Sequence, residues 1–183
     1  GGAYTLVYQL QNGNWTLLGT EIRGNFHSVS LSHDGTVLAV GDSGWDQVRV
    51  YRFVNNDWTI IDSAITGSGG FGFSVSLSAN GRIVAIGAPE NDGTDSFDSY
   101  RGVVYVYQNV NDEWNRVGSI LYGATEDDKF GRSVCLSDDG TVLAVGAISN
   151  DSSGRLSGQV RVFQLVDDEW TLIGNPVNGR GEQ

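Results

Sequence analysis

Carboxylates are the side chains of this sequence most able to do chemistry, and they gather in three polar segments. The candidate binding residues are Glu90, Asp92, Asp95 and Asp98 in the first segment, Glu126, Asp127 and Asp128 in the second, and Asp151 in the third. Calcium prefers carboxylate oxygens, but the spacing of Asp92, Asp95 and Asp98 differs from the alternating aspartates of an EF-type loop. We therefore expect an acidic binding surface, and we predict no metal and no other cofactor.

Nucleophiles and general bases are too few and too scattered to suggest catalysis. His27 and His33 are the only histidines, and no Ser-His-Asp or Cys-His grouping can be nominated from their positions. The single cysteine, Cys135, excludes an intrachain disulfide and a multi-cysteine metal site, and it is interpreted as a small packing residue. We predict that the chain is not an enzyme. Facing carboxylates of the glycosidase type are the one chemistry left open.

The acidic composition limits the possible partners. The chain has 22 acidic and 11 basic residues and a net charge of −11, which repels nucleic acid and anionic lipid headgroups. Its apolar runs are far shorter than the ~20 residues of a membrane helix. We therefore expect neither nucleic-acid binding nor direct membrane insertion.

Two features of the sequence concern processing. The sequons that begin at Asn14 and Asn150 are candidate glycosylation sites, and they favour an extracellular location. The chain opens with Gly1-Gly2-Ala3 and shows no features of a signal peptide. We therefore expect it to be a segment of a longer protein.

The elements that position these residues recur along the chain. A block at residues 28–41 is repeated at 74–87 and again at 133–146, and an internal repeat of this kind decides the whole fold. Each block leads to an aromatic residue that is followed, seven positions later, by a tryptophan. The four tail tryptophans, one of them in an incomplete copy at the N-terminus, are Trp15, Trp58, Trp114 and Trp170. The constant spacing indicates a rigid repeat core with variable loops.

Each repeat divides into four short strands. In the first copy, residues 28–32 and 47–53 alternate polar and apolar side chains, residues 36–40 are nearly all apolar, and residues 58–61 form a short closing strand. The pairs between the first two strands predict type I′ turns with positive φ at the glycine; they are Asp34-Gly35, Asn80-Gly81 and Asp139-Gly140. Each repeat is therefore an antiparallel meander, and meanders of this kind bury their faces by stacking as the blades of a β-propeller. The predicted fold class is all-β, with about three and a half tandem four-stranded antiparallel blades of a larger propeller or assembly.

Two short motifs recur inside the repeats. The second copy contains Phe71-Gly72 and Gly87-Ala88-Pro89, and the third contains Phe130-Gly131 and Gly146-Ala147-Ile148. The first copy is degenerate, with Asn25-Phe26 and Gly41-Asp42. The motifs resemble those of the FG-GAP repeat, the unit of integrin α-type β-propellers, and the resemblance extends from residue 3 to about residue 174. It implies an extracellular or cell-surface location.

Two further comparisons qualify this resemblance. The segment from the aromatic residue to the tryptophan is also similar to the kelch repeat, although the kelch double glycine is absent from the sequence. Integrin-type FG-GAP blades often carry an aspartate-rich calcium loop between their first two strands, which here is shortened to Asp34-Gly35 and its equivalents. Such a turn is too tight to surround calcium with six to eight oxygens. The calcium role is therefore not carried over.

The repeats predict the organisation of the chain. Residues 3–18 form the C-terminal half of a blade, 19–62 the first full blade, 63–117 the second, 118–174 the third, and 175–183 a tail or linker. In a meander the short turns lie at one end, so the long acidic loops lie together at the other end, where binding residues are commonly found. An incomplete ring also leaves a blade face uncovered. We expect that face to be apolar and to be lined by Val134, Leu136, Val160 and Val162.

These observations favour a non-catalytic extracellular adhesion, scaffold or filament-forming module. Its expected partners are other proteins or copies of itself, bound through exposed blade faces and edges, with glycans as a further candidate. The alternative is a carbohydrate- or cation-binding propeller that uses the acidic loop face.

Overall fold

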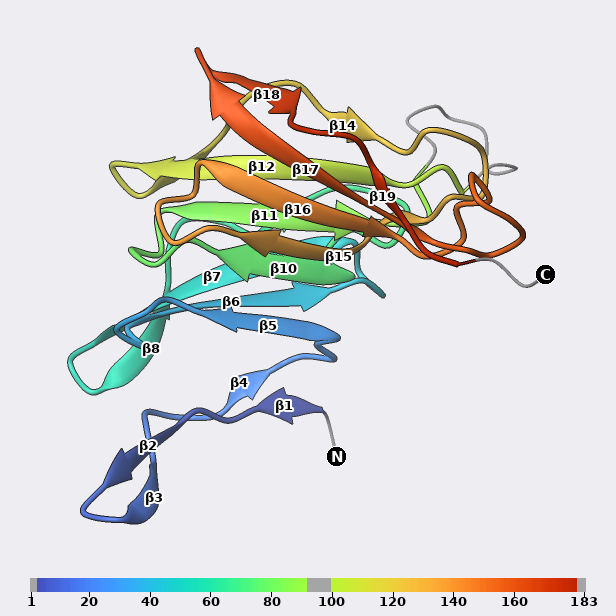
Figure 1. The fold of residues 1–183 in the computed structure, drawn as a ribbon. Helices are drawn as coiled ribbons and strands as arrows, with labels where there is room; N and C mark the ends of the chain where they lie inside the picture. Colours follow the sequence, from blue (N-terminus) through green and yellow to red (C-terminus); the bar gives the residue numbers. More distant parts are fainter. Residues whose placement is uncertain (1–2, 92–99, 181–183) are drawn as a thin grey trace.

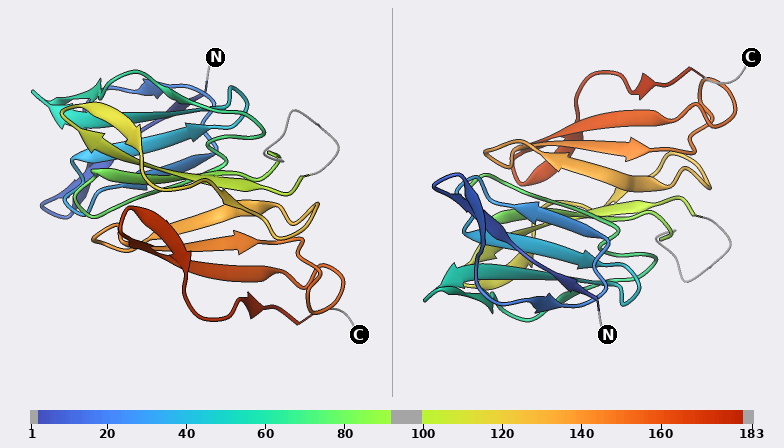
Figure 2. Two further views of the ribbon diagram at one scale, coloured as in Figure 1. Left: turned by 90° about the horizontal axis from the view of Figure 1, so that it is seen from above. Right: turned by 90° about the horizontal axis from the view of Figure 1, so that it is seen from below.

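The repeats fold into antiparallel sheets that follow one another in chain order. The computed structural model describes residues 3–91 and 100–180, and no helix occurs among these residues. Three five-stranded sheets, called blades 1, 2 and 3 from here on, are preceded by a half-blade of two short strand pairs (Figure 1, Figure 2). This arrangement confirms the predicted all-β fold of tandem propeller blades.

The strands are short and recur with similar lengths from blade to blade. The half-blade contains β1 (Tyr4–Thr5), β2 (Tyr8–Gln11), β3 (Asn14–Leu17) and β4 (Ile22–Arg23). Blade 1 contains β5 (Ser28–Leu31), β6 (Val37–Asp42), β7 (Gln47–Val54), β8 (Asp57–Ile60) and β9 (Ile65–Thr66). Blade 2 contains β10 (Ser74–Leu77), β11 (Ile83–Ala88), β12 (Val103–Val110), β13 (Glu113–Arg116) and β14 (Leu121–Tyr122). Blade 3 contains β15 (Phe130–Leu136), β16 (Val142–Ala147), β17 (Gln159–Val166), β18 (Glu169–Leu172) and β19 (Val177–Asn178).

The blades pack face to face through the apolar second strand of each sheet. Because side chains alternate along a strand, Val84 and Ile86 of β11 pack against blade 1, while Ala85 packs against blade 3. All three side chains are fully buried. Burial of a valine or isoleucine side chain contributes about 1.5–3 kcal/mol, so β11 helps to stabilise both interfaces of blade 2.

Each blade is extended by a two-residue strand that returns along its third strand. β9 pairs with β7, β14 with β12, and β19 with β17. These short strands follow the predicted blade ends at residues 62, 117 and 174, but they pair with the preceding sheet. The closing strand of each meander is therefore not the last strand of its blade, while the predicted domain boundaries themselves stay predictions.

The four tail tryptophans occupy equivalent positions, as predicted. Trp15, Trp58, Trp114 and Trp170 are each the second residue of a four-residue strand, in β3, β8, β13 and β18 respectively. Their surroundings differ, because Trp58 and Trp170 are buried, Trp114 is half-buried and Trp15 is exposed.

The turns between the first two strands of each blade differ from the prediction. Gly35, Gly81 and Gly140 have the expected positive φ, at 71°, 66° and 74°, but the residues before them do not. The type I′ prediction is therefore wrong, since that turn needs positive φ at both central residues. In blade 1 the Ser32 N–H donates to the Val37 carbonyl and the Gly35 N–H donates to the Ser32 carbonyl, which closes a longer loop.

Type I′ geometry occurs instead in the turns between the third and fourth strands. In blade 1 both central residues of this turn, Asn55 and Asn56, have positive φ, at 53° and 64°. The Val54 and Asp57 pair closes this two-residue turn directly. Asparagine and aspartate tolerate this backbone region better than other non-glycine residues, which explains the polar pairs found there.

A carboxylate or amide organises each turn between the first two strands. Asp139 Oδ1 accepts hydrogen bonds from Ser137 Oγ at 2.6 Å, from the Thr141 N–H at 3.0 Å and from Thr141 Oγ1 at 2.9 Å. The Ser137 hydroxyl, followed by the Thr141 N–H and hydroxyl, lowers the pKa of Asp139. Asn80 takes the equivalent place in blade 2, where its Oδ1 accepts from Ser78 Oγ and from the Arg82 N–H.

The Asp139→Asn variant should fold normally at neutral pH and lose less stability in acid. A carboxyl whose pKa is lowered by folding stabilises the protein above its unfolded pKa of about 3.9, and this stabilisation disappears as the pH falls through the folded value. Urea unfolding between pH 7 and pH 2 should therefore give a shallower pH dependence for the variant. Asp138→Asn, which changes the exposed neighbour, is the control, and an equal change in both variants would contradict the prediction.

Candidate functional site

The predicted acidic surface is present in part. Glu90, Glu126, Asp127 and Asp151 are exposed on loops at the end of the blades opposite the short turns (Figure 1). The other predicted residues of the first segment, Asp92, Asp95 and Asp98, lie outside the described residues. Within residues 3–91 and 100–180, no three histidine, cysteine or acidic side chains come close enough to hold a metal ion. The binding role of the exposed carboxylates stays a prediction.

Asp128 and Asn150 form a buried pair that closes two loops of blade 3. Asp128 Oδ2 accepts hydrogen bonds from the Ala124 and Thr125 N–H groups at 2.8 and 2.9 Å, and its Oδ1 accepts one from Asn150 Nδ2 at 2.9 Å. The side chains are only 0% and 1% exposed. The prediction that Asp128 is a surface ligand is therefore wrong, because both of its carboxylate oxygens accept hydrogen bonds inside the protein.

The same pair affects the glycosylation predictions. A glycan would have to be attached to Asn150 Nδ2, which is buried and donates to Asp128. Glycosylation of Asn150 is therefore contradicted by the fold. Asn14 is exposed at the turn between β2 and β3, and its glycosylation stays a prediction.

A repeated contact, called the latch from here on, joins each blade to the next. At the joint between blades 2 and 3, the Gly131 carbonyl accepts a hydrogen bond from Ser74 Oγ at 2.8 Å. The same carbonyl lies against Gly87, where a Cβ would meet the oxygen at 2.0 Å. The equivalent residues between blades 1 and 2 are Gly72, Ser28 and Gly41, with a hydrogen bond of 2.9 Å and the same 2.0 Å approach. The glycines of the two repeat motifs are thus required because two backbones meet there.

A second serine adds to each latch. Ser76 Oγ of blade 2 accepts a hydrogen bond from the Leu136 N–H of blade 3 at 3.0 Å, and Ser30 Oγ of blade 1 accepts one from the Leu77 N–H at 2.9 Å. Hydroxyls that alternate along the first strand therefore supply a donor and an acceptor to the next blade.

Blade 3 presents the same groups on its outer face, the side turned away from blade 2. Ser133 and Gly146 correspond to the latch residues Ser74 and Gly87, and Cys135 takes the place of Ser76. Ser133 and Cys135 are exposed. A groove of about 360 Å³ runs along this face, and Ile148 and Val160 supply its large exposed apolar side chains together with Val177.

The outer face of blade 3 differs in part from the predicted apolar face. Val160 is exposed there, as expected, and Val162 lies on the same side of the sheet, in line with Cys135. Val134 and Leu136 were wrongly placed, because they lie in the core formed with blade 2. Neighbouring strand residues point to opposite faces, so a list that mixes the two sets cannot describe one surface.

The joint between blades 1 and 2 departs from the repeat at one position. Four residues after the tail tryptophan, the other copies have Gly19, Gly118 and Gly174, all with positive φ, whereas this joint has Asp62 with φ 61°. A Cβ at Gly19 would lie 2.7 Å from Cδ1 of Trp58, and a Cβ at Gly118 would lie 2.6 Å from Cδ1 of Trp170. Asp62 carries this Cβ, so Trp114 cannot occupy the place that the other two indoles take.

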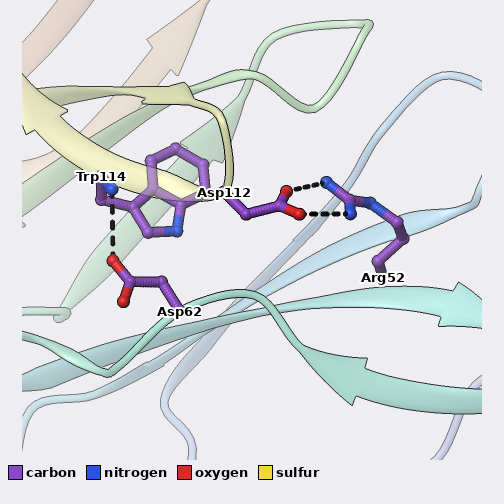
Figure 3. Close-up of polar contacts among 4 residues, drawn as sticks. All are labelled: Arg52, Asp62, Asp112 and Trp114. Carbon is purple, nitrogen blue, oxygen red and sulfur yellow. Dashed lines mark hydrogen bonds and ion pairs between the residues drawn. The ribbon is translucent and has the colours of Figure 1, made fainter.

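The displaced indole has lost its hydrogen bond to the preceding blade. Trp58 Nε1 donates to the Leu18 carbonyl at 2.9 Å and Trp170 Nε1 donates to the Val117 carbonyl at 3.2 Å. Trp114 Nε1 is buried and has no partner within the described part of the chain. Its backbone N–H donates to Asp62 Oδ2 at 3.3 Å instead (Figure 3).

An ion pair bridges the same joint. Arg52 of β7 and Asp112 of the turn before β13 are joined by an Nη2 to Oδ1 contact of 2.7 Å (Figure 3). The hydrogen bond from Arg52 lowers the pKa of Asp112, and the same bond raises the pKa of Arg52. The side chains are 43% and 62% exposed, and such surface pairs stabilise a fold little.

A pocket of about 560 Å³ lies at this joint, between the short turns of blades 1 and 2. Arg52, Arg82, Asn109, Asn111 and Asp112 are among its polar lining residues. Asn109 Nδ2 is buried and has no partner among the described residues. The pocket therefore combines polar side chains with a donor that the protein itself does not satisfy.

Neither the latch nor this pocket was predicted from the sequence. The latch could have been found, because Ser28, Ser74 and Ser133 recur at the first position of the repeated block and Gly41, Gly87 and Gly146 recur at its last position. The pocket could have been suspected from the single aspartate at a position that is glycine in the other three copies.

Blades joined face to face by a repeated contact define a β-propeller repeat protein. Residues 122–163 match the family model of the FG-GAP repeat, which confirms the FG-GAP resemblance of the motifs. No curated protein matches the sequence. FG-GAP repeats are typical of extracellular or surface proteins and of repeat-based modules for protein interaction, and the fold of this chain is that of such a module.

Solved structures show the same fold at low sequence identity. The chain is similar to hydrazine synthase from Kuenenia stuttgartiensis, with a TM-score of 0.61, 16% identity, and coverage of 96% of this chain and 43% of that chain. It is similar to Sqt1 from Saccharomyces cerevisiae, with a TM-score of 0.56, 12% identity, and coverage of 85% of this chain and 36% of that chain. It is also similar to a protein from Lactobacillus plantarum, with a TM-score of 0.62, 16% identity, and coverage of 94% of this chain and 48% of that chain. This chain therefore spans less than half the length of each of these structures, and the likeness shows the fold alone.

Proposed function

We propose that this chain is a non-catalytic scaffold or adhesion module of the cell exterior. It assembles by docking a further blade, one that carries a Phe-Gly motif, onto the outer face of blade 3. The observation that carries the proposal is the recurrence of the latch. Ser133 and Gly146 repeat the groups with which Ser74 and Gly87 hold blade 3, and they are placed on a face with an open groove. The partner blade would be supplied by another protein or by another part of the same protein.

The chemistry of the partner follows from the two existing joints. An aromatic residue and a glycine in the left-handed region should stand at or just before the start of its first strand, as Phe71-Gly72 and Phe130-Gly131 do. Blade 1 of a second copy does not meet this requirement, because Phe26 stands at the position of that glycine. The described residues contain no helix with the length and apolar character needed to cross a membrane.

A chain extended by one duplicated blade tests the proposal. Replacing residues 174–183 with a second copy of residues 118–178, with its own cysteine changed to serine, offers blade 3 a Phe-Gly start in the natural connection. Cys135 lies exposed in the middle of the outer face and is the only cysteine left. We expect its reaction with a thiol reagent to slow by at least tenfold in the extended chain.

Two variants of the extended chain complete this test. Gly146→Val in the original blade should restore rapid labelling, because the side chain would meet the incoming carbonyl, as a Cβ at Gly87 would. Gly44→Val, at an exposed glycine of blade 1 with free space around it, is the matched control and should leave Cys135 protected. Labelling of the extended chain as fast as that of the original chain would overturn the proposal.

A further inference from the structure

The joint between blades 1 and 2 holds two buried donors that the described part of the chain does not satisfy. They are Asn109 Nδ2 and Trp114 Nε1. The two residues are directly paired across β12 and β13, so their side chains leave the same face of the sheet. Of the two residues, Asn109 lines the pocket at this joint. A buried donor without a partner is unfavourable, so a ligand whose acceptor atom reaches Asn109 Nδ2 gains free energy that the protein alone does not.

The space at the joint is large enough for a small ligand. The pocket of about 560 Å³ is within the range of ligand sites. A second pocket of about 320 Å³, which Asp62 lines, shares Arg52, Ile61 and Asp112 with it. The two hollows therefore meet at the Arg52 and Asp112 ion pair. Figure 3 shows this ion pair together with Asp62 and Trp114.

The charges at this joint balance, although the whole chain is strongly acidic. Two guanidinium groups, Arg52 and Arg82, face two carboxylates, Asp62 and Asp112. A free anion or cation would meet as much repulsion as attraction there. A neutral ligand fits this balance best.

The remaining lining residues indicate which neutral ligand. Asn111 adds an amide group that both donates and accepts, and Val37 and Ile61 form apolar walls. Hydroxyl groups on a ring match this mixture, because each hydroxyl can donate and accept while the C–H faces pack on apolar side chains. We propose that the pocket between blades 1 and 2 binds a neutral saccharide of one or two sugar units, at the short-turn end and away from the acidic loops.

The substitution of glycine by Asp62 is central to this site, and reversing it gives the decisive variant. Asp62→Gly removes the Cβ that keeps Trp114 from the position of Trp58 and Trp170. The indole should then move against blade 1, where its Nε1 can donate a hydrogen bond to the Ile61 carbonyl. The Leu18 and Val117 carbonyls accept the equivalent hydrogen bonds from the other two indoles. The variant should keep or raise the melting temperature, because glycine adopts positive φ without strain, and yet lose the ligand.

Calorimetric titration of the 183-residue chain with glucose, galactose, mannose, lactose, maltose and cellobiose tests the proposal. We expect at least one of these sugars to bind with a Kd in the millimolar range or below. Asp62→Gly and Asn109→Leu should each weaken that binding at least tenfold. Asp168→Gly removes an aspartate with almost the same φ, 62°, from blade 3, and this matched control should bind as the original chain does.

The proposal is overturned if none of the sugars binds, or if inorganic phosphate or citrate binds at this joint in their place. It is also overturned if Asp62→Gly and Asn109→Leu, both shown to be folded by their cooperative thermal unfolding, bind as tightly as Asp168→Gly. None of these results bears on the docking face of blade 3, which lies at a different joint.

Discussion

Replacing Gly87 with alanine should lower the free energy of unfolding by about 3 kcal/mol, the upper end of the usual cost of overpacking. The new Cβ would meet the Gly131 carbonyl at 2.0 Å. That oxygen belongs to the backbone and is also held by Ser74 Oγ, so it cannot move aside cheaply. Urea unfolding at pH 7 measures the loss.

Gly146→Ala is the control, since it makes the same change at the same position of the next repeat. Its Cβ would meet only the Ser133 side chain closely, at 2.4 Å to Oγ, and an exposed hydroxyl can rotate away. We expect a change within about 0.5 kcal/mol, as is usual at surface sites. Equal losses in the two variants would mean that the close approach of the backbones does not explain the glycine.

The Phe130→Ala variant should lose about 3–5 kcal/mol of stability, the usual cost of deleting a fully buried aromatic side chain. Phe130 is 0% exposed and meets the Phe163 ring edge-on, with centroids 6.1 Å apart. The Arg161 guanidinium lies 4.2 Å from the ring centroid, and its Nε is buried without a partner among the described residues. Removing the ring leaves both a cavity and a poorly solvated cation.

Phe26→Ala provides the comparison from the degenerate copy. Phe26 is half-buried, and the guanidinium of Arg49 lies farther from its ring centroid, at 5.6 Å. Chemical unfolding should show a loss less than half as large as that of Phe130→Ala. A loss of similar size would indicate that the first copy docks as tightly as the others despite its altered motif.

The repeats made the architecture predictable from the sequence. Polar and apolar residues alternate along the same segments of three copies, and the constant interval before each tryptophan sets the register of the third and fourth strands. These are local patterns, and local patterns decide how a meander forms.

Features that depend on two segments at once escaped prediction. The Asp-Gly pairs are compatible with several turns, and the choice was made by the pairing of Ser32 with Val37. Asp128 stands in an acidic run that suggests a solvated loop, but the loops around it fold over it and use its oxygens. Among the described residues, the exposed Glu90, Glu126 and Asp127 have no such partners, and Asp151 accepts a hydrogen bond only from the Leu156 N–H of its own loop.

The short strands β9 and β14 have a mechanical consequence. Each lies in the linker that leaves one blade for the next and is hydrogen-bonded back to the blade that it leaves. A few residues later the chain is fastened to the same blade again, through the latch. Each linker is therefore hydrogen-bonded to the preceding blade at two places. A row of such blades should transmit tension as one stiff body until a joint shears.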